Sequence, residues 1–182
     1  MRTIKVKELM VPLEKYATVP DVATLREAVL ALEKAQMKLG PSQHKHRAIM
    51  VLDENGKVMS RITIKDILVA LEPNYGKVNG TRVLERSGYS PDLIRSMLED
   101  YALWTEPLQF FRERATQLKV GDFIQAPSEA EYIDENATLG EATHQLVVNP
   151  YHSLLVTSGD EVVGILRLSD VFTKICDIIK GD

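Results

Sequence analysis

The sequence predicts an α/β (α+β) fold of two pseudo-symmetric repeats, each a small sheet flanked by helices, with a helical insert between them. Three observations support this prediction. The motif at residues 24–28 (TLREA) returns at residues 138–142 (TLGEA), which indicates an internal repeat. Both copies are followed by two short apolar runs that a turn separates. The length of 182 residues fits one domain built from two such halves.

A helix opens each repeat. Thr24 and Glu27 have the spacing of a capping box, in which a hydroxyl and a carboxylate satisfy free backbone N–H groups at a helix start. Thr138 and Glu141 have the same spacing. Apolar residues recur behind both motifs at helical intervals, so each motif predicts the start of an amphipathic helix.

A hairpin and a second helix follow. In the first repeat we expect a strand at residues 48–52, a turn at 53–56 containing Asn-Gly, and a return strand at 57–62. The next helix begins near Thr63, and its counterpart in the second repeat begins near Arg167. The strands and turn of the second repeat are expected at residues 153–157, 158–160 and 162–166.

These elements divide the chain into three parts. Residues 1–72 form the first repeat, residues 73–117 form the insert, and residues 118–182 form the second repeat. The two repeats are expected to pack as one module, because a hairpin with two helices cannot cover both of its own faces. The first repeat is longer than the second, and most of the extra residues fall in a polar stretch at 38–45 that is typical of a loop.

The insert predicts helices of its own. Ser90 followed by Pro91 is a typical helix start. Behind it, apolar side chains follow helical spacing at Leu93, Met97, Leu98, Tyr101 and Trp104. Another helix is expected after Pro107. These apolar faces either cover the core of the repeats or form a surface for a partner or a second copy.

Composition excludes several classes of protein. A formal net charge of −4 argues against a nonspecific nucleic-acid binder. No apolar run approaches the roughly 18 residues that a membrane span needs. The single Cys176 excludes an internal disulfide, and the first residues alternate charged and apolar side chains, unlike a secretory signal. We therefore expect a cytoplasmic protein that binds neither nucleic acid nor membrane.

Taken together, the motifs resemble a tandem pair of CBS (cystathionine beta-synthase) domains, also called a Bateman module. The similarity lies in the family's opening V-x-D-x-M, its T-L-x-E-A helix start, its V-V-D-x-x-G hairpin and its closing G-h-h-T-x-x-D. The matching segments are residues 6–10, 24–28, 51–56 and 60–66, and then 120–124, 138–142 and 164–170.

The resemblance implies a regulatory, energy-sensing protein without catalytic residues. Its repeats would pack about a pseudo-twofold axis, with clefts that bind AMP, ADP, ATP or S-adenosylmethionine. No cofactor would be required, and a homodimer that signals to a protein partner would be expected. The alternative is a structural, dimerisation or interaction module whose clefts are degenerate and empty.

The resemblance also implies roles for residues at the end of each hairpin. Asp66 and Asp170 would hold ribose hydroxyls, because a carboxylate accepts hydrogen bonds from a cis-diol. Thr63 would contact a phosphate at a helix start, where free N–H groups favour an anion. Arg167 stands where the second site needs a hydroxyl, so it either pairs with a phosphate or blocks the cleft. Ser60 replaces a glycine, which argues against tight binding in the first site.

Other candidates complete the expected site. The pair Thr63 and Asp66 has a second interpretation, because a hydroxyl followed by an acid is also the pattern of a plain helix cap. By the resemblance, adenine would lie against segments that precede the first helix and open each hairpin. These residues are Tyr16, Ala17, Thr18, Ala48 and Ile49 in one copy, and Glu131, Tyr132, Ser153 and Leu154 in the other.

The chain shows no sign of a metal site or of catalysis. His44 and His46 would need further ligands to hold a metal, so they are interpreted as part of a solvated basic loop. The alternative is that this loop approaches the phosphates of a bound nucleotide, because His46 and Arg47 immediately precede the first strand. The motifs G-x-S-x-G, G-x-x-x-x-G-K-[ST] and H-E-x-x-H are absent. We therefore expect neither a metal ion nor an enzyme.

Overall fold

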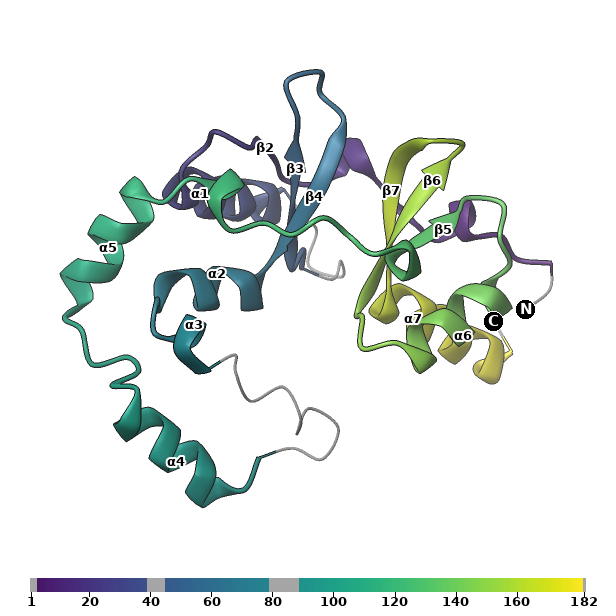
Figure 1. Cartoon of the computed structure of the whole chain (residues 1–182). Coiled ribbons are helices and arrows are strands. Elements are labelled where there is room, and N and C mark those ends of the chain that lie inside the picture. Colours follow the sequence, from purple (N-terminus) through teal and green to yellow (C-terminus); the bar gives the residue numbers. More distant parts are fainter. Residues whose placement is uncertain (1–2, 39–44, 79–88, 182) are drawn as a thin grey trace.

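The computed structural model describes residues 3–38, 45–78 and 89–181. It contains two small sheets with helices on their outer faces (Figure 1). With η for a 3-10 helix, the elements in chain order are η1 (Val6–Glu8), β1 (Val11–Pro12), η2 (Leu13–Lys15), β2 (Thr18–Pro20), α1 (Leu25–Met37), β3 (Ala48–Leu52), β4 (Val58–Thr63), α2 (Ile64–Leu71), α3 (Tyr75–Val78), α4 (Pro91–Asp100), α5 (Leu108–Gln117), η4 (Val120–Asp122), η5 (Glu129–Glu131), β5 (Tyr132–Asp134), α6 (Leu139–Val148), β6 (Ser153–Ser158), β7 (Glu161–Arg167) and α7 (Leu168–Lys180).

Both hairpins form as expected. β3 pairs antiparallel with β4, and β6 pairs antiparallel with β7. Gly56 and Gly159 have φ of 78° and 62° in the two turns, a conformation that glycine adopts without a steric penalty. In the first turn, Asp53 Oδ1 accepts hydrogen bonds from the backbone N–H groups of Asn55 and Lys57. The turn residues therefore fix where each strand returns.

The predicted capping boxes form at α1 and α6. Thr24 Oγ1 accepts from the Glu27 N–H at 3.2 Å, while the Glu27 carboxylate accepts from the Thr24 N–H at 2.7 Å. Thr138 and Glu141 repeat both contacts. The Thr24 backbone hydrogen bond lowers the pKa of Glu27, and the Thr138 backbone hydrogen bond lowers that of Glu141. The helix starts could be read from sequence because these contacts are local.

Three short strands were not predicted. β2 pairs in parallel with β3, and β5 pairs in parallel with β6. β1 joins the sheet of the second repeat, which therefore has the order β1-β7-β6-β5, while the first repeat has β2-β3-β4. Each of these strands is two or three residues long, too short for an alternating pattern in the sequence.

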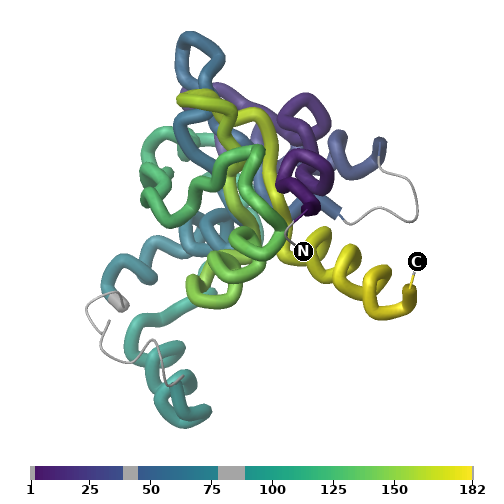
Figure 2. The backbone as a smooth tube through the Cα atoms, turned by 90° about the vertical axis from the view of Figure 1, so that its right-hand side faces the viewer, coloured from purple at the N-terminus to yellow at the C-terminus, as the bar shows by residue number. Residues whose placement is uncertain are grey.

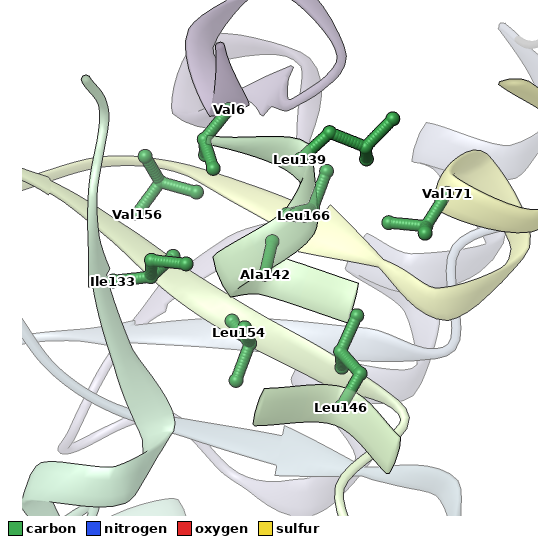
Figure 3. Close-up of a cluster of buried hydrophobic side chains, with 9 residues drawn as sticks. All are labelled: Val6, Ile133, Leu139, Ala142, Leu146, Leu154, Val156, Leu166 and Val171. Atoms are coloured by element: carbon green, nitrogen blue, oxygen red, sulfur yellow. The ribbon is translucent and has the colours of Figure 1, made fainter. Parts of the chain in front are cut away.

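Each repeat receives its opening segment from the other half of the chain. Val6 N–H donates to the Ala137 carbonyl at 2.9 Å, and Val120 N–H donates to the Ala23 carbonyl at 2.8 Å. Val6 is fully buried in the core of the second repeat. Figure 3 shows that core, whose side chains are Val6, Ile133, Leu139, Ala142, Leu146, Leu154, Val156, Leu166 and Val171. This exchange joins the repeats into one module.

A third apolar cluster lies between the sheets. Met50 and Leu155 are fully buried there, beside Tyr16, Ala48 and Ile165. These residues come from both hairpins and from the segment between η2 and β2. The cluster holds the two sheets in contact, and the cleft described below lies at its edge.

The insert divides into a part that packs on the first repeat and a part that projects. α5 packs against α1 and α2, and the Arg114 Nε donates to the Ala70 carbonyl at 2.8 Å. α4 lies farther out on the same side, away from the second repeat (Figure 1). It leaves apolar side chains exposed at Leu93, Ile94 and Leu98. Figure 2 shows α7 and the insert projecting in different directions from the body.

The first insert helix ends earlier than its apolar spacing predicted. α4 stops at Asp100, and Trp104 lies in the turn beyond it with φ of 58°. The Trp104 N–H donates to the carboxylate of Glu72 at 2.7 Å, and its Nε1 donates to the Tyr75 hydroxyl at 3.0 Å. The hydrogen bonds to Glu72 and Tyr75 favour the turn over a further helical turn.

Two further observations concern the described residues only. No helix within them is long and apolar enough to cross a membrane. The polar loop expected at residues 38–45 lies mostly outside the described ranges, as does His44. His46 is fully buried, so its assignment to a solvated loop was wrong.

Candidate functional site

A large cleft lies between the two repeats. Its volume is about 1230 Å³. The walls are formed by the first turns of α2 and α7, by β4, and by the segment at 123–127 that leads into η5. Residues of both expected half-sites therefore face one shared space.

The first half-site is built at the junction of β4 and α2. Thr63 and Asp66 form a capping box, with Thr63 Oγ1 at 2.7 Å and Thr63 N at 2.8 Å from Asp66 Oδ2. Both residues line the cleft, and Asp66 is exposed. The capping interpretation of this pair is thus correct, and it is compatible with binding, since all these side-chain contacts use the same carboxylate oxygen.

The second half-site is built differently. Arg167 Nε donates to Asp170 Oδ2 and Arg167 Nη2 donates to Asp170 Oδ1, both at 2.6 Å. The two side chains are only 14% and 13% exposed. Arg167 lines the cleft, whereas Asp170 lies behind it and is not among the lining residues. The expected ribose carboxylate of this half is therefore occupied by the chain itself.

A second buried ion pair joins the repeats across the cleft. Arg61 Nη2 of β4 donates to Glu131 Oε2 of η5 at 2.6 Å, and these side chains are 7% and 16% exposed. Within the described residues, Arg61 Nη1 is buried and has no hydrogen-bond partner. Glu131, expected beside adenine, thus holds an arginine at the cleft wall.

The cleft lining carries more cationic than acidic side chains although the protein is acidic. The lining includes five cationic side chains and two acidic ones, against a net charge of −4 for the whole chain. The cations are Lys45, Arg47, Arg61, Lys65 and Arg167, and the acids are Asp66 and Glu131. A concave surface with this balance attracts anions such as phosphate groups.

Some expected adenine contacts face the cleft and others do not. Tyr16, Ala48, Glu131 and Ser153 line it. The remaining side chains lie elsewhere: Ala17, Ile49 and Leu154 are buried in the repeat cores, Thr18 lines a separate cavity of about 430 Å³, and Tyr132 packs beside the cluster between the sheets. In a strand, alternate side chains face opposite sides, so only every second residue of a segment can face the cleft.

Several lining residues were not predicted. Lys65 lies inside the motif that carries Thr63 and Asp66, so its position is a usable signal. Arg61 also lies inside that motif, whereas Lys45 lies outside the quoted motifs and has no such signal. Among the described residues, no three His, Cys, Asp or Glu side chains form a group that could hold a metal ion.

Tyr16 and His46 form a buried wall next to Arg167. Their ring centroids lie 4.2 Å apart. Burial raises the pKa of Tyr16 to about 12, and Arg167, which hydrogen-bonds the tyrosine, acts in the opposite direction. Burial lowers the pKa of His46, and the charge of Arg167 lowers it further. A hydrogen bond with the Lys15 backbone and the charge of Asp170 act in the opposite direction. Both rings are therefore held neutral near pH 7.

The chain segments facing Ser60 and Gly164 approach the sheets differently. A Cβ atom at Gly164 would lie 2.6 Å from the Val11 carbonyl oxygen, because β1 pairs closely with β7. In the first repeat, Ser60 Oγ instead donates to the Gln125 carbonyl at 2.6 Å. Residues 123–127 consequently border the cleft instead of forming a strand on β4.

The sequence matches the CBS domain family over residues 6–73 and 120–177, which together make up most of the chain. The chain belongs to the CBS domain family. The two matched regions correspond to the two repeats, so the protein carries a CBS pair. A search of curated protein sequences finds no match.

Solved CBS structures share this fold. A CBS domain-containing protein from Bacillus anthracis is 20% identical with a TM-score of 0.61, and the match covers 97% of this chain and 95% of that chain. CBSX2, a CBS-pair protein from Arabidopsis thaliana solved in complex with AMP, is 15% identical with a TM-score of 0.58, covering 96% and 98%. The CBS domain of a bacterial CNNM/CorC family Mg²⁺ transporter, solved with ATP, is 16% identical with a TM-score of 0.59, covering 96% and 89%.

Proposed function

We propose that the chain is a regulatory CBS pair that binds an adenosine nucleotide or S-adenosylmethionine in the cleft between its repeats. One observation carries the proposal: the Thr63 and Asp66 pair opens into a spacious cleft with an excess of positive charge. The cleft volume of about 1230 Å³ exceeds the roughly 300–1,000 Å³ of typical small-molecule sites, so the cleft has room for such a ligand.

Each part of such a ligand has a counterpart in the cleft. The exposed Asp66 carboxylate suits the two ribose hydroxyls. Thr63, Lys65 and Arg47 at the start of α2 and near β3 suit the phosphates. Tyr16 and Ala48 offer apolar surface to the base. The AMP complex of CBSX2 and the ATP complex of the transporter CBS domain support the choice of ligand class.

The proposal includes a homodimer. α2 and α7 both lie below their sheets (Figure 1). They expose apolar side chains, among them Leu68 at 48% and Ile179 at 78%. Apolar surface of this kind on a short helix favours association with a second copy. Signalling would then pass to a regulated protein partner.

A second candidate function is a ligand-free structural or interaction module. The Arg167 and Asp170 pair favours it, because the second half-site is filled by its own side chains. The apolar face of α4 also favours it, since Leu93, Ile94 and Leu98 are exposed. Recovery of a nucleotide from an extract of the denatured, freshly purified protein would argue against this alternative.

Isothermal titration with AMP, ADP, ATP and S-adenosylmethionine tests the proposal. We expect the wild-type chain to bind at least one of the four, and Asp66→Ala to lose that binding while keeping the wild-type circular dichroism spectrum. Asp92→Ala is the matched control, because Asp92 lies on the insert with its side chain 92% exposed. If the folded wild-type protein releases no heat with any of the four ligands, the proposal is wrong.

A further inference from the structure

The two halves of the cleft differ at the hydroxyl position of the closing motif, where the first has Thr63 and the second has Arg167. Thr63 directly precedes α2, and Asp66 follows it by three residues. Arg167 directly precedes α7, and Asp170 follows it by three residues. Thr63 contacts only one oxygen of its aspartate. Arg167 takes both oxygens of Asp170, through two parallel hydrogen bonds of 2.6 Å. The chain thus presents one open carboxylate and one closed carboxylate.

The closed half resists opening for electrostatic reasons. A bidentate pair between a guanidinium and a carboxylate is among the strongest side-chain contacts. Both partners are more than four-fifths buried, so separating them would leave two poorly solvated charges. Arg167 also hydrogen-bonds Tyr16, which is itself buried beside His46. A ribose that replaced Arg167 would give Asp170 only hydrogen bonds from neutral hydroxyls, in place of a charged guanidinium.

We propose that Arg167 closes the second half of the cleft, so that each chain binds a single adenosine ligand, held at Asp66. Arg167 is then the residue that determines the stoichiometry. This inference rests on the proposed function, but it makes a separate claim. A CBS pair that binds nucleotide in both halves of the cleft would fulfil the proposed function and contradict the inference.

The position of the arginine can be exchanged between the halves. In Arg167→Thr, the new hydroxyl can cap α7 as Thr63 caps α2, and Asp170 is released toward the cleft. In Thr63→Arg, the new guanidinium can pair with Asp66 and close the first half. The double variant Thr63→Arg/Arg167→Thr keeps the composition and the net charge of the wild type, which makes it the matched control.

Isothermal titration measures the number of sites, on variants whose thermal unfolding stays cooperative. The ligand is AMP, or, if AMP does not bind the wild type, whichever of ADP, ATP and S-adenosylmethionine does. We expect one site in the wild type, two in Arg167→Thr, none in Thr63→Arg and one in the double variant. Adding Asp170→Ala to the double variant removes its site, whereas adding Asp66→Ala does not.

The outcomes separate the inference from the proposed function. Two ligand sites in the wild type overturn the inference and leave the proposed function standing. One site in both the wild type and Arg167→Thr overturns it as well. A wild type that binds no AMP, ADP, ATP or S-adenosylmethionine overturns both.

Discussion

Single residues determine how each sheet edge meets the segment that crosses it. Gly164 lets β1 approach β7, because the Val11 carbonyl oxygen occupies the space that a Cβ atom would need. Ser60, at the matching place, keeps a hydroxyl there and binds the Gln125 carbonyl. The expectation that this serine weakens the first site stays a prediction. In the structure, Ser60 lines the open cleft.

Gly164→Ala should destabilise the fold by about 1–3 kcal/mol, because an added methyl group would overlap β1 in a packed core. Urea unfolding measures the change. Gly140→Ala is the control, since its Cβ would lie 3.7 Å from Thr138 Oγ1, an ordinary contact. Alanine there should stabilise α6 by about 0.5–1 kcal/mol, through helix propensity. A Gly164→Ala protein as stable as the wild type would contradict the close approach.

His46 should make the protein less stable in acid. Its pKa is lowered in the folded state by burial and by Arg167, so below its ordinary pKa of about 6.5 the unfolded chain binds the proton more readily. Stability conferred by the neutral ring is present above that pH and is lost as pH falls. Urea unfolding at pH 7.5 and pH 5.0 should show a smaller loss in His46→Phe than in the wild type.

His144→Phe is the control for the pH experiment, because His144 is exposed on α6. It should keep the wild-type difference in unfolding free energy between the two pH values. An equal acid loss in His46→Phe and the wild type would show that the buried imidazole is not responsible.

At the scale of elements, the sequence predicted what local contacts determine. The capping boxes at Thr24 and Thr138 and the hairpin turns use residues within a few positions of each other, so their signals are readable. β1 and the exchange of opening segments were not predicted, because their partners lie far away along the chain. The end of α4 before Trp104 was not predicted either, because the Trp104 N–H bonds to Glu72, which lies outside that helix.

Glu72 should anchor the insert to the end of α2. Glu72 is 1% exposed, and its carboxylate accepts from the N–H groups of Asn74 at 3.0 Å and Trp104 at 2.7 Å. Glu72→Gln places an amide N–H₂ against one of these donors, which should cost about 1.5–3 kcal/mol of unfolding free energy. Because Trp104 is the only tryptophan of the chain, its emission should shift to the red.

Tyr75→Phe serves as the control for the insert, because it removes only the acceptor of Trp104 Nε1. It should change the emission less than Glu72→Gln does. Unchanged emission and unchanged stability in Glu72→Gln would contradict the anchoring role.

At the scale of the whole molecule, the proposed dimer rests on the exposed apolar side chains of α2 and α7. Leu68→Asp combined with Ile179→Asp should turn a dimer into a monomer in sedimentation velocity, since burying two new charges is costly. Val22→Asp is the control, because Val22 is 66% exposed at the turn after β2. A wild type that sediments as a monomer would contradict the dimer.

The candidate site was predictable only in part. Thr63, Asp66 and Arg167 could be placed at helix starts, because the closing motif marks them in each repeat. The cationic lining could not, since no motif marks Lys45, and the ion pair of Arg61 with Glu131 forms only when the repeats pack. The sequence left two alternatives for Arg167, pairing with a phosphate or blocking the cleft by its bulk, and both stay predictions. Its ion pair with Asp170 was not predicted.

A crystal structure of the wild-type chain grown with AMP would locate the ligand. We predict the ribose hydroxyls within hydrogen-bond distance of the Asp66 carboxylate, the phosphate toward Lys65 and Arg47, and the ion pair of Arg167 and Asp170 intact. An empty cleft in a protein saturated with AMP, or AMP bound on another surface, would contradict this prediction.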